Sequence, residues 1–337
     1  MTGNATGGSR NHFPAGSLAA GGASVVLTPE TAGWTYSGLQ VLDLAAGATV
    51  ELASGPDEFV LLPLTVRDVA VHVTASVAAG VVASEHDFTL AGRSTVFAAV
   101  SDFCYVGRDS AVSLMSATGG RLAVASARCE RVLPARYQPA DAVPVELRGA
   151  GSCSRQVNNF AAAGVFDADR IIAVEVITPG GNWSSYPPHK HDEDIPGEES
   201  VLEEIYYYEF SNPSVDQPGV APGAASDGVG YQRVYGTPDR PIDVLAEVRT
   251  GDVVAMPHGW HGPSMATPGY DMYYLNVMAG PSAERAWLIR DDPDRGWIRQ
   301  TWAGQPVDPR LPMSGPDAVG ATASPRTHAS QQRGDSE

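Results

Sequence analysis

The sequence predicts an all-β protein that folds as two antiparallel barrels of similar size. Short segments rich in β-branched and other apolar residues follow one another at intervals of roughly ten residues, each bounded by Gly, Pro, Asp or Ser. The periodicity of an amphipathic helix is rare between the two ends of the chain. The segments fall into two series of similar length and density, which is typical of a duplicated barrel.

The first series lies within residues 21–150, which we expect to form the N-terminal barrel. Its clearest strands are expected at residues 23–27, 48–52, 58–62, 69–73 and 122–125. Residues 1–20 are rich in Gly, Ser and Ala and lack periodicity, so we expect a flexible tail. His72 and His86, in this half, have no partner at strand spacing, and we expect them to be structural.

The second series lies within residues 151–312, which we expect to form the C-terminal barrel. Its strands are expected at residues 171–177, 204–210, 231–235, 246–249, 252–256 and 272–278. A Gly/Ser-rich stretch at 148–155 favours a domain boundary near residue 150. Residues 313–337 contain no cluster of aromatic or branched apolar residues, and we expect a disordered tail.

Composition argues against several classes of function. The net charge of −17 disfavours nucleic acids and anionic membranes as partners, because both are bound by basic surfaces. No apolar run approaches the length of a membrane span and no apolar leader is evident, so we expect a cytoplasmic protein. The three cysteines are too few for a disulfide framework. The Gly-rich patches lack the strand-to-helix setting of a nucleotide site, so no nucleotide cofactor is expected.

Three histidines and a carboxylate in the second half have the arrangement of a metal site. In the tripeptide HKH, His189 and His191 are two residues apart, so in a strand both imidazoles point to one face while Lys190 points to the other. Glu204 opens the apolar segment EIYYYEF, and His261 ends the hairpin GDVVAMPHGWH. Three imidazoles and one carboxylate suit Zn, Mn, Fe, Co or Ni and leave positions open for a substrate.

Two neighbouring residues compete for these assignments. His258 lies three residues before His261 in PHGWH, and Glu203 directly precedes Glu204. We favour His261 because the turn delivers it to the start of the following strand. We favour Glu204 because it directly precedes the apolar strand, which leaves Glu203 as a solvated carboxylate at the strand edge.

This constellation resembles the cupin superfamily, in which a small antiparallel β-barrel, the double-stranded β-helix, carries HxH and Glu in one motif and His in a second. The twelve residues between His191 and Glu204 exceed the usual cupin spacing, and PHGWH is one residue shorter than PxGxxH. These departures point to a narrower group, the 5-deoxy-glucuronate isomerases of myo-inositol catabolism. The resemblance is dense over residues 148–298 and rests on the motifs RGAGSCSRQVNNF, GGNWSSYPPHKHDED, EESVLEEIYYYEF, YQRVYGTPD, GDVVAMPHGWHGP, PGYDMYYLNVMAGP and DDPDRGWI.

The resemblance implies a two-cupin (bicupin) chain with its metal site in the C-terminal barrel. It implies an intramolecular oxidoreductase that converts 5-deoxy-D-glucuronate, a small anionic sugar acid, to 5-dehydro-2-deoxy-D-gluconate. A further similarity, to the 4-deoxy-threo-hexosulose-uronate ketol-isomerases, implies zinc on His189, His191, Glu204 and His261, with Mn or Fe as alternatives. Formation of a homo-oligomer is left open.

Aldose–ketose isomerisation moves a hydrogen between neighbouring carbons, either through a base or as a hydride, and the sequence leaves this choice open. As catalytic candidates we consider Lys190, Glu203 and Tyr208, and we also consider Glu199. For each of these residues, the alternative is a position on the surface or a role in orienting the residues that contact the substrate.

The substrate carboxylate calls for a guanidinium group, which binds carboxylates with two parallel hydrogen bonds. Arg233 in QRVY and Arg155 in SRQV are the candidates, with an internal ion pair as the alternative for each. Tyr274 is a candidate for placing a hydroxyl group near the substrate. The competing functions are a metal-dependent cupin oxygenase, an isomerase of another deoxy-uronate, and a binding protein without catalysis.

Overall fold

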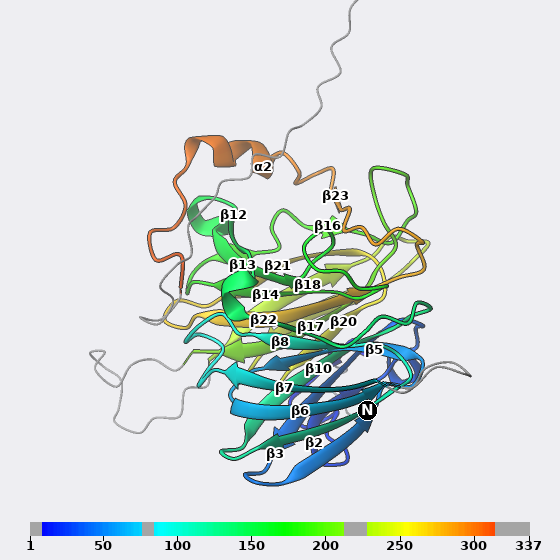
Figure 1. Ribbon diagram of the computed structural model, residues 1–337. Helices are drawn as coiled ribbons and strands as arrows, with labels where there is room; N and C mark the ends of the chain where they lie inside the picture. Colours follow the sequence, from blue (N-terminus) through cyan, green and yellow to red (C-terminus); the bar gives the residue numbers. More distant parts are fainter. Residues whose placement is uncertain (1–8, 76–83, 212–227, 314–337) are drawn as a thin grey trace, which may run out of the picture.

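The computed structural model describes residues 9–75, 84–211 and 228–313. Within these ranges the chain forms antiparallel sheets that stack as four layers, two in the N-terminal half and two in the C-terminal half (Figure 1). The predicted all-β fold is confirmed. The helical segments are single turns: α1 (Pro29–Ala32), η1 (Ala140–Ala142), η2 (Gly151–Cys153), α2 (Ile298–Thr301) and η3 (Trp302–Gly304).

The N-terminal barrel consists of a six-stranded sheet that packs on a four-stranded sheet. The six-stranded sheet contains, in spatial order, β11 (Arg136–Gln138), β8 (Phe103–Val106), β5 (Asp57–Pro63), β10 (Gly120–Arg128), β3 (Ser37–Leu44) and β2 (Ala23–Leu27). The four-stranded sheet contains β4 (Thr49–Ala53), β9 (Ser110–Ser116), β6 (Arg67–Ala75) and β7 (Ser84–Gly92). Apolar side chains such as Leu61, Val71 and Leu114 fill the space between these sheets.

The C-terminal barrel also has two sheets, and it carries the predicted site. Its seven-stranded sheet contains β1 (His12–Phe13), β20 (Val253–Met256), β17 (Glu203–Phe210), β22 (Met272–Ala279), β14 (Ile172–Thr178), β13 (Arg155–Ala161) and β12 (Val145–Arg148). The other sheet contains β19 (Asp243–Val248), β18 (Gly230–Tyr235), β21 (Trp260–Ala266), β16 (His189–Lys190) and β23 (Arg290–Asp291), with β15 (Trp183–Ser184) paired to β21.

The two halves share one hydrophobic core, which lies between their central sheets. Strands β14 and β22 are buried along their whole length, because one face packs on the other half and the other face lines the C-terminal barrel. By contrast, β6 and β9 alternate between buried and more exposed residues, as expected for a sheet with one face in water. The strand phase therefore decides which side chains reach each interior.

The segment that we expected to be a flexible tail is ordered from residue 9 onward. Strand β1 pairs with β20, and Asn11 Nδ2 donates a hydrogen bond to the carbonyl oxygen of Ala255 at 3.1 Å. His12 Nε2 lies 3.0 Å from Asp252 Oδ2. These partners lie some 240 residues away along the chain, so local composition gave no sign of them. Residues 1–8 lie outside the described ranges.

Two further boundaries can be compared with the expectations. Strand β12 pairs with β13, so residues from Val145 onward belong to the C-terminal sheet, and the domain boundary near residue 150 stays a prediction. The expected disordered tail, from residue 314 onward, lies outside the described residues. The helical turns in the described ranges are too short to cross a bilayer.

Candidate metal centre

Three strands bring the predicted ligands to the inner side of the C-terminal barrel. Strand β16 pairs with β21 so that His189 lies directly opposite His261. Within the described ranges, the side chains of His191, Glu204 and His261 form a group whose ligand atoms all lie within 4.8 Å of one another. His189 is outside this group, but the centroid of its ring is 4.5 Å from that of His261. All four side chains are buried.

Each histidine is oriented by a backbone carbonyl group. The distance from Nδ1 to the carbonyl oxygen is 3.4 Å from His189 to Pro187, 3.1 Å from His191 to Leu202 and 3.2 Å from His261 to Gly259. A proton on Nδ1 can be donated to this oxygen, which leaves the lone pair of Nε2 free for another partner. Histidines that bind metals are commonly oriented in this way.

Glu204 holds its negative charge between two of these rings. Its Oε2 lies 3.1 Å from His191 Nε2 and 2.9 Å from His261 Nε2. Its Oε1 accepts a hydrogen bond of 2.7 Å from Asn276 Nδ2. Burial opposes ionisation, but His261 and His191 hold the pKa of Glu204 well below its ordinary value. The carboxylate is therefore ionised and fixed in orientation.

This donor set fits a divalent metal ion. Among residues 9–75, 84–211 and 228–313, the buried His261 Nε2 finds no hydrogen-bond partner, although it lies 2.9 Å from Glu204 Oε2. An imidazole lone pair and a carboxylate oxygen that approach without a hydrogen bond suit two ligands of one cation. Burial, and then the neighbouring His261, lower the pKa of His189 well below its ordinary value, which keeps that ring in the neutral form that binds metals.

Tyrosines continue the same inner face beyond the ligands. Tyr206 and Tyr208 follow Glu204 at intervals of two residues on β17, and Tyr274 lies on the neighbouring strand β22. The ring of Tyr206 stacks on that of Tyr274 at 4.3 Å and lies 6.5 Å from that of His261. Burial raises the pKa values of Tyr208 and Tyr274. At neutral pH these phenols are protonated, so they can donate hydrogen bonds but are poor bases.

Glu203 and Lys190 point away from the histidines, as strand alternation requires for residues next to inward-facing ligands. The Glu203 carboxylate accepts hydrogen bonds of 2.7 to 3.0 Å from the backbone N–H groups of residues 35–37 in the N-terminal half. Lys190 Nζ donates to Asp192 and Glu199, each at 2.7 Å. Their placement disfavours the expected catalytic roles, because Glu203 joins the two halves and Lys190 neutralises acids of the following loop.

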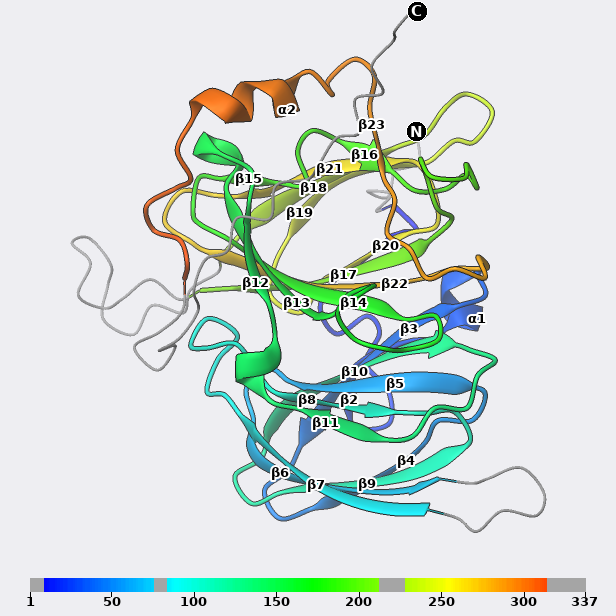
Figure 2. The ribbon, with the colours of Figure 1, turned by 45° about the horizontal axis from the view of Figure 1, so that its top comes forward.

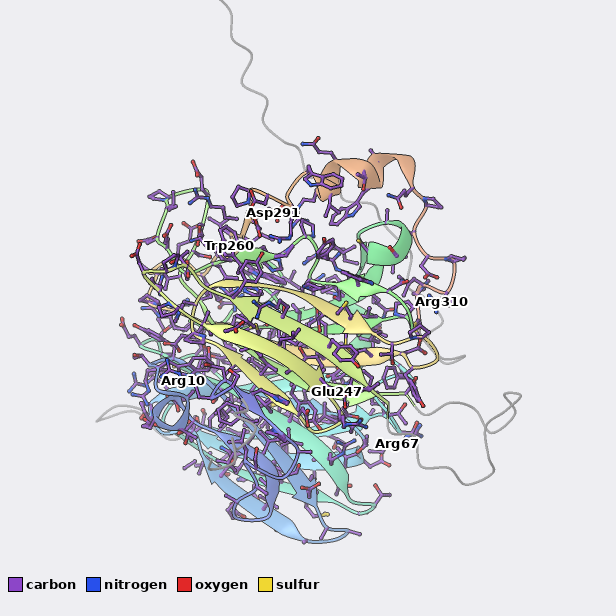
Figure 3. The ribbon with its side chains drawn as sticks, turned by 180° about the vertical axis from the view of Figure 1, so that it is seen from behind. Arg10, Arg67, Glu247, Trp260, Asp291 and Arg310 are labelled. Atoms are coloured by element: carbon purple, nitrogen blue, oxygen red, sulfur yellow. The ribbon has the colours of Figure 1, made fainter. Side chains whose placement is uncertain are left out.

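Arg233 does not reach the interior of the barrel. Strand β18 places Val234 opposite His261 on the inner face, so Arg233 lies on the outer face. There it forms an ion pair with Asp243 and lines a surface pocket of about 320 Å³. Trp260, labelled in Figure 3, precedes His261 and so lies on the same outer face. The placement of Arg233 fits the ion-pair alternative and disfavours the expected contact with substrate.

Arg155 lies inside the molecule at the start of β13, and only 5% of its surface is exposed. Its Nη1 donates a hydrogen bond of 3.1 Å to the carbonyl oxygen of Cys153, and its guanidinium group is 5.6 Å from the centre of the Trp302 ring. Of the two arginine candidates, Arg155 is the buried one, and its contact with the substrate carboxylate stays a prediction.

The sequence reasoning missed the polar residues that hold the site in place. Besides Asn276, these are Ser185, whose Oγ is 2.9 Å from Tyr206 Oη, and Gln232, whose Oε1 accepts a 2.9 Å hydrogen bond from Tyr208 Oη. Asn276 and Gln232 carried a usable signal, since each is a lone amide on the inward phase of its strand. Ser185 lies between strands, where phase gives no guidance.

The chain is similar to proteins of one family over most of its length. The model of a protein family described as KduI/IolB matches residues 13–298. The chain is 39% identical over 278 residues to a 5-deoxy-glucuronate isomerase of Geobacillus kaustophilus, covering 82% of this chain and 91% of the relative. It is 35% identical over 276 residues to a 5-deoxy-glucuronate isomerase of Bacillus subtilis (strain 168), covering 81% of this chain and 91% of that relative.

Solved structures show the same fold. An IolB-like protein from Salmonella typhimurium LT2 matches with a TM-score of 0.72 and 33% identity, covering 85% of this chain and 98% of that one. Lactobacillus farciminis oxalate decarboxylase matches with a TM-score of 0.55 and 11% identity, covering 86% of this chain and 90% of that one. The second likeness bears on the fold alone, and it confirms the predicted cupin fold.

Proposed function

The chain belongs to the KduI/IolB family, and from this premise we propose that it is a 5-deoxy-glucuronate isomerase, an enzyme that interconverts a sugar-acid aldose and ketose. The observation that carries this proposal is the 39% identity, over 82% of this chain, to a relative of that name. The buried group of histidines and a carboxylate supports it, because an isomerase of this kind needs a way to polarise a carbonyl group.

The substrate in this proposal is 5-deoxy-D-glucuronate, and the product is 5-dehydro-2-deoxy-D-gluconate. The reaction reduces an aldehyde to a hydroxymethyl group while the neighbouring alcohol becomes a ketone, so it needs no external oxidant or reductant. We place the enzyme in the cytoplasm, in myo-inositol catabolism. The three cysteines support that location, since all are free thiols.

The metal in this proposal is a single divalent ion held by His189, His191, Glu204 and His261. The close approach of three ligand atoms and the carbonyl contacts of all three Nδ1 atoms support this set. Zinc is the ion that the family resemblance favours, with Mn and Fe as alternatives. When bound, the ion would supply a Lewis acid that polarises the aldehyde and its neighbouring hydroxyl group.

The residues of the chain then orient the sugar and control its protons. Asn276 holds Glu204 in the orientation that serves the ligand set. The protonated phenols of Tyr208 and Tyr274 are hydrogen-bond donors on the same inner face and can stabilise charge on sugar oxygens. Glu203 and Lys190 face away, so neither is placed to take a proton from carbon. We therefore favour direct transfer of hydrogen between the two carbons.

An isomerisation assay under argon tests this function. The full chain, loaded with zinc, is incubated with 5-deoxy-D-glucuronate, and the ketose is followed by NMR. Conversion without oxygen is the expected result. The alternative of a metal-dependent oxygenase predicts no conversion under argon and oxygen uptake in air. A parallel assay with other deoxy-uronates separates the remaining alternative, in which one of them is converted more efficiently.

A further inference from the structure

Arg155 is a buried cation without an anionic partner. Among the residues that the structure describes, no carboxylate oxygen lies within 4.0 Å of its guanidinium group. With the same described residues it makes one side-chain hydrogen bond, to the backbone carbonyl group of Cys153. Burial, and then the charge of Arg148, lower the pKa of Arg155 to about 10. A buried charge is costly unless a counter-charge offsets the lost hydration.

The neighbouring arginines show that this situation is specific to Arg155. Arg148 pairs with Arg155 across strands β12 and β13, but its guanidinium group binds Glu146 at 2.8 and 3.0 Å. Arg299, on α2, binds both carboxylate oxygens of Asp291 at 2.5 and 2.6 Å. Both α2 and the following turn η3 lie over the C-terminal barrel (Figure 2). Each of the two flanking arginines thus has its own carboxylate.

Arg155 shares the inner face of the barrel with the candidate metal ligands. Val157, two residues further along β13, packs in the same interior cluster as Tyr206 and Tyr274. Val157 pairs with Val176, which in turn pairs with Tyr274, so Tyr274 lies on the same face two strands away from β13. The Tyr206 ring stacks on Tyr274 and faces the His261 ring, so aromatic side chains connect Arg155 to the ligands.

A buried hydroxyl group lies beside Arg155. Gln156 pairs with Ile177, so the next pair along the two strands is Arg155 with Thr178. Thr178 Oγ1 is buried and has no hydrogen-bond partner in the described part of the chain. The guanidinium group of Arg155 has further N–H groups besides the one bound to Cys153, and the hydroxyl group of Thr178 shares its inner face, so both can donate hydrogen bonds to a carboxylate.

We propose that Arg155, assisted by Thr178, binds the terminal carboxylate of the sugar acid and sets the selectivity for uronates over neutral aldoses. This inference rests on the proposed function. The substrate has its aldehyde and its carboxylate at opposite ends of a six-carbon chain. The barrel has its candidate metal ligands and the guanidinium group of Arg155 on one inner face, with the stacked rings of Tyr206 and Tyr274 between them.

The test compares two substrates: 5-deoxy-D-glucuronate and its neutral analogue with a hydroxymethyl group in place of the carboxylate. Arg155→Lys keeps the charge but loses the paired hydrogen bonds, so kcat/KM for the uronate should fall roughly 10- to 150-fold. The neutral analogue should be converted as by the wild type, and the metal content should not change. Arg148→Lys is the matched control and should preserve the discrimination, because Glu146 already binds that side chain.

Thr178→Val, a change of similar shape, is the second variant if Arg155→Lys does not fold. It should raise KM for the uronate several-fold and leave the neutral analogue unaffected. Equal losses on both substrates, or unchanged uronate kinetics in both variants, would overturn the role of Arg155. A wild type that converts both compounds equally well would contradict this inference alone. A wild type that converts neither would contradict the proposed function, and this inference with it.

Discussion

Replacing Asn276 by alanine should weaken metal binding without unfolding the barrel. Asn276 Nδ2 donates the 2.7 Å hydrogen bond that orients Glu204, and its side chain is buried with 2% exposed. Loss of a group that orients a metal ligand typically lowers affinity by about 10- to 100-fold, which corresponds to roughly 1.4 to 2.7 kcal/mol. The unpaired Oε1 of Glu204 should cost about 1 to 3 kcal/mol of folding free energy in the apo protein.

The assay is titration of the apo protein with buffered zinc, together with urea unfolding of the apo form. Asn158→Ala is the matched control, because Asn158 Nδ2 donates a similar hydrogen bond of 3.1 Å to the buried carboxylate of Glu175. That carboxylate also binds Arg93 of the N-terminal half and lies outside the candidate metal centre. The control should lose stability and keep its zinc affinity. Equal zinc affinity in Asn276→Ala and the wild type would refute the view that this amide supports the metal site.

Four further outcomes follow from the placement of side chains. Glu203→Gln should keep its metal content and its kcat. Its free energy of unfolding in urea should fall by about 1 to 2 kcal/mol, because the amide nitrogen cannot accept hydrogen bonds from the backbone N–H groups of residues 35–37. A large loss of kcat would instead support a catalytic role for Glu203. His261→Ala should lose the metal while His258→Ala keeps it, measured by metal analysis, and the reverse order would show that the turn had been misassigned. Arg233→Lys should leave kcat/KM unchanged in the isomerase assay, and a tenfold loss would show that the outer face takes part. Conversion in D₂O should give a product without deuterium in its hydroxymethyl group, checked by NMR, whereas a full equivalent of deuterium would reveal a base.

Strand alternation explains which residues of the candidate site could be predicted from the sequence. The period of two residues favours Glu204 over Glu203, and the structure places Glu204 with the histidines and Glu203 against the N-terminal half. The same rule applies to QRVY, where Tyr231, Arg233 and Tyr235 share the outer face. The position of Arg233 between the two metal motifs along the chain favours a contact with substrate, but its phase on the strand argues against that contact.

Other features depend on partners that are distant in the sequence. The order of residues 9–20 comes from strand β20, which has no sequence signal near the N-terminus. The role of Glu203 comes from backbone groups of residues 35–37, and the isolation of Arg155 is visible only once the carboxylates around it have been placed. Pairing of this kind is a property of the tertiary fold, so periodicity and motifs could not predict it.

We propose that isomerisation depends on the buried group around Glu204. The most direct measurement is the conversion of 5-deoxy-D-glucuronate under argon by the wild type and by Glu204→Gln, each analysed for metal and checked for folding by circular dichroism. We expect the wild type to hold about one metal ion per chain and to form the ketose, while the folded variant holds little metal and forms none. Full activity in a folded, metal-free Glu204→Gln protein would contradict this proposal.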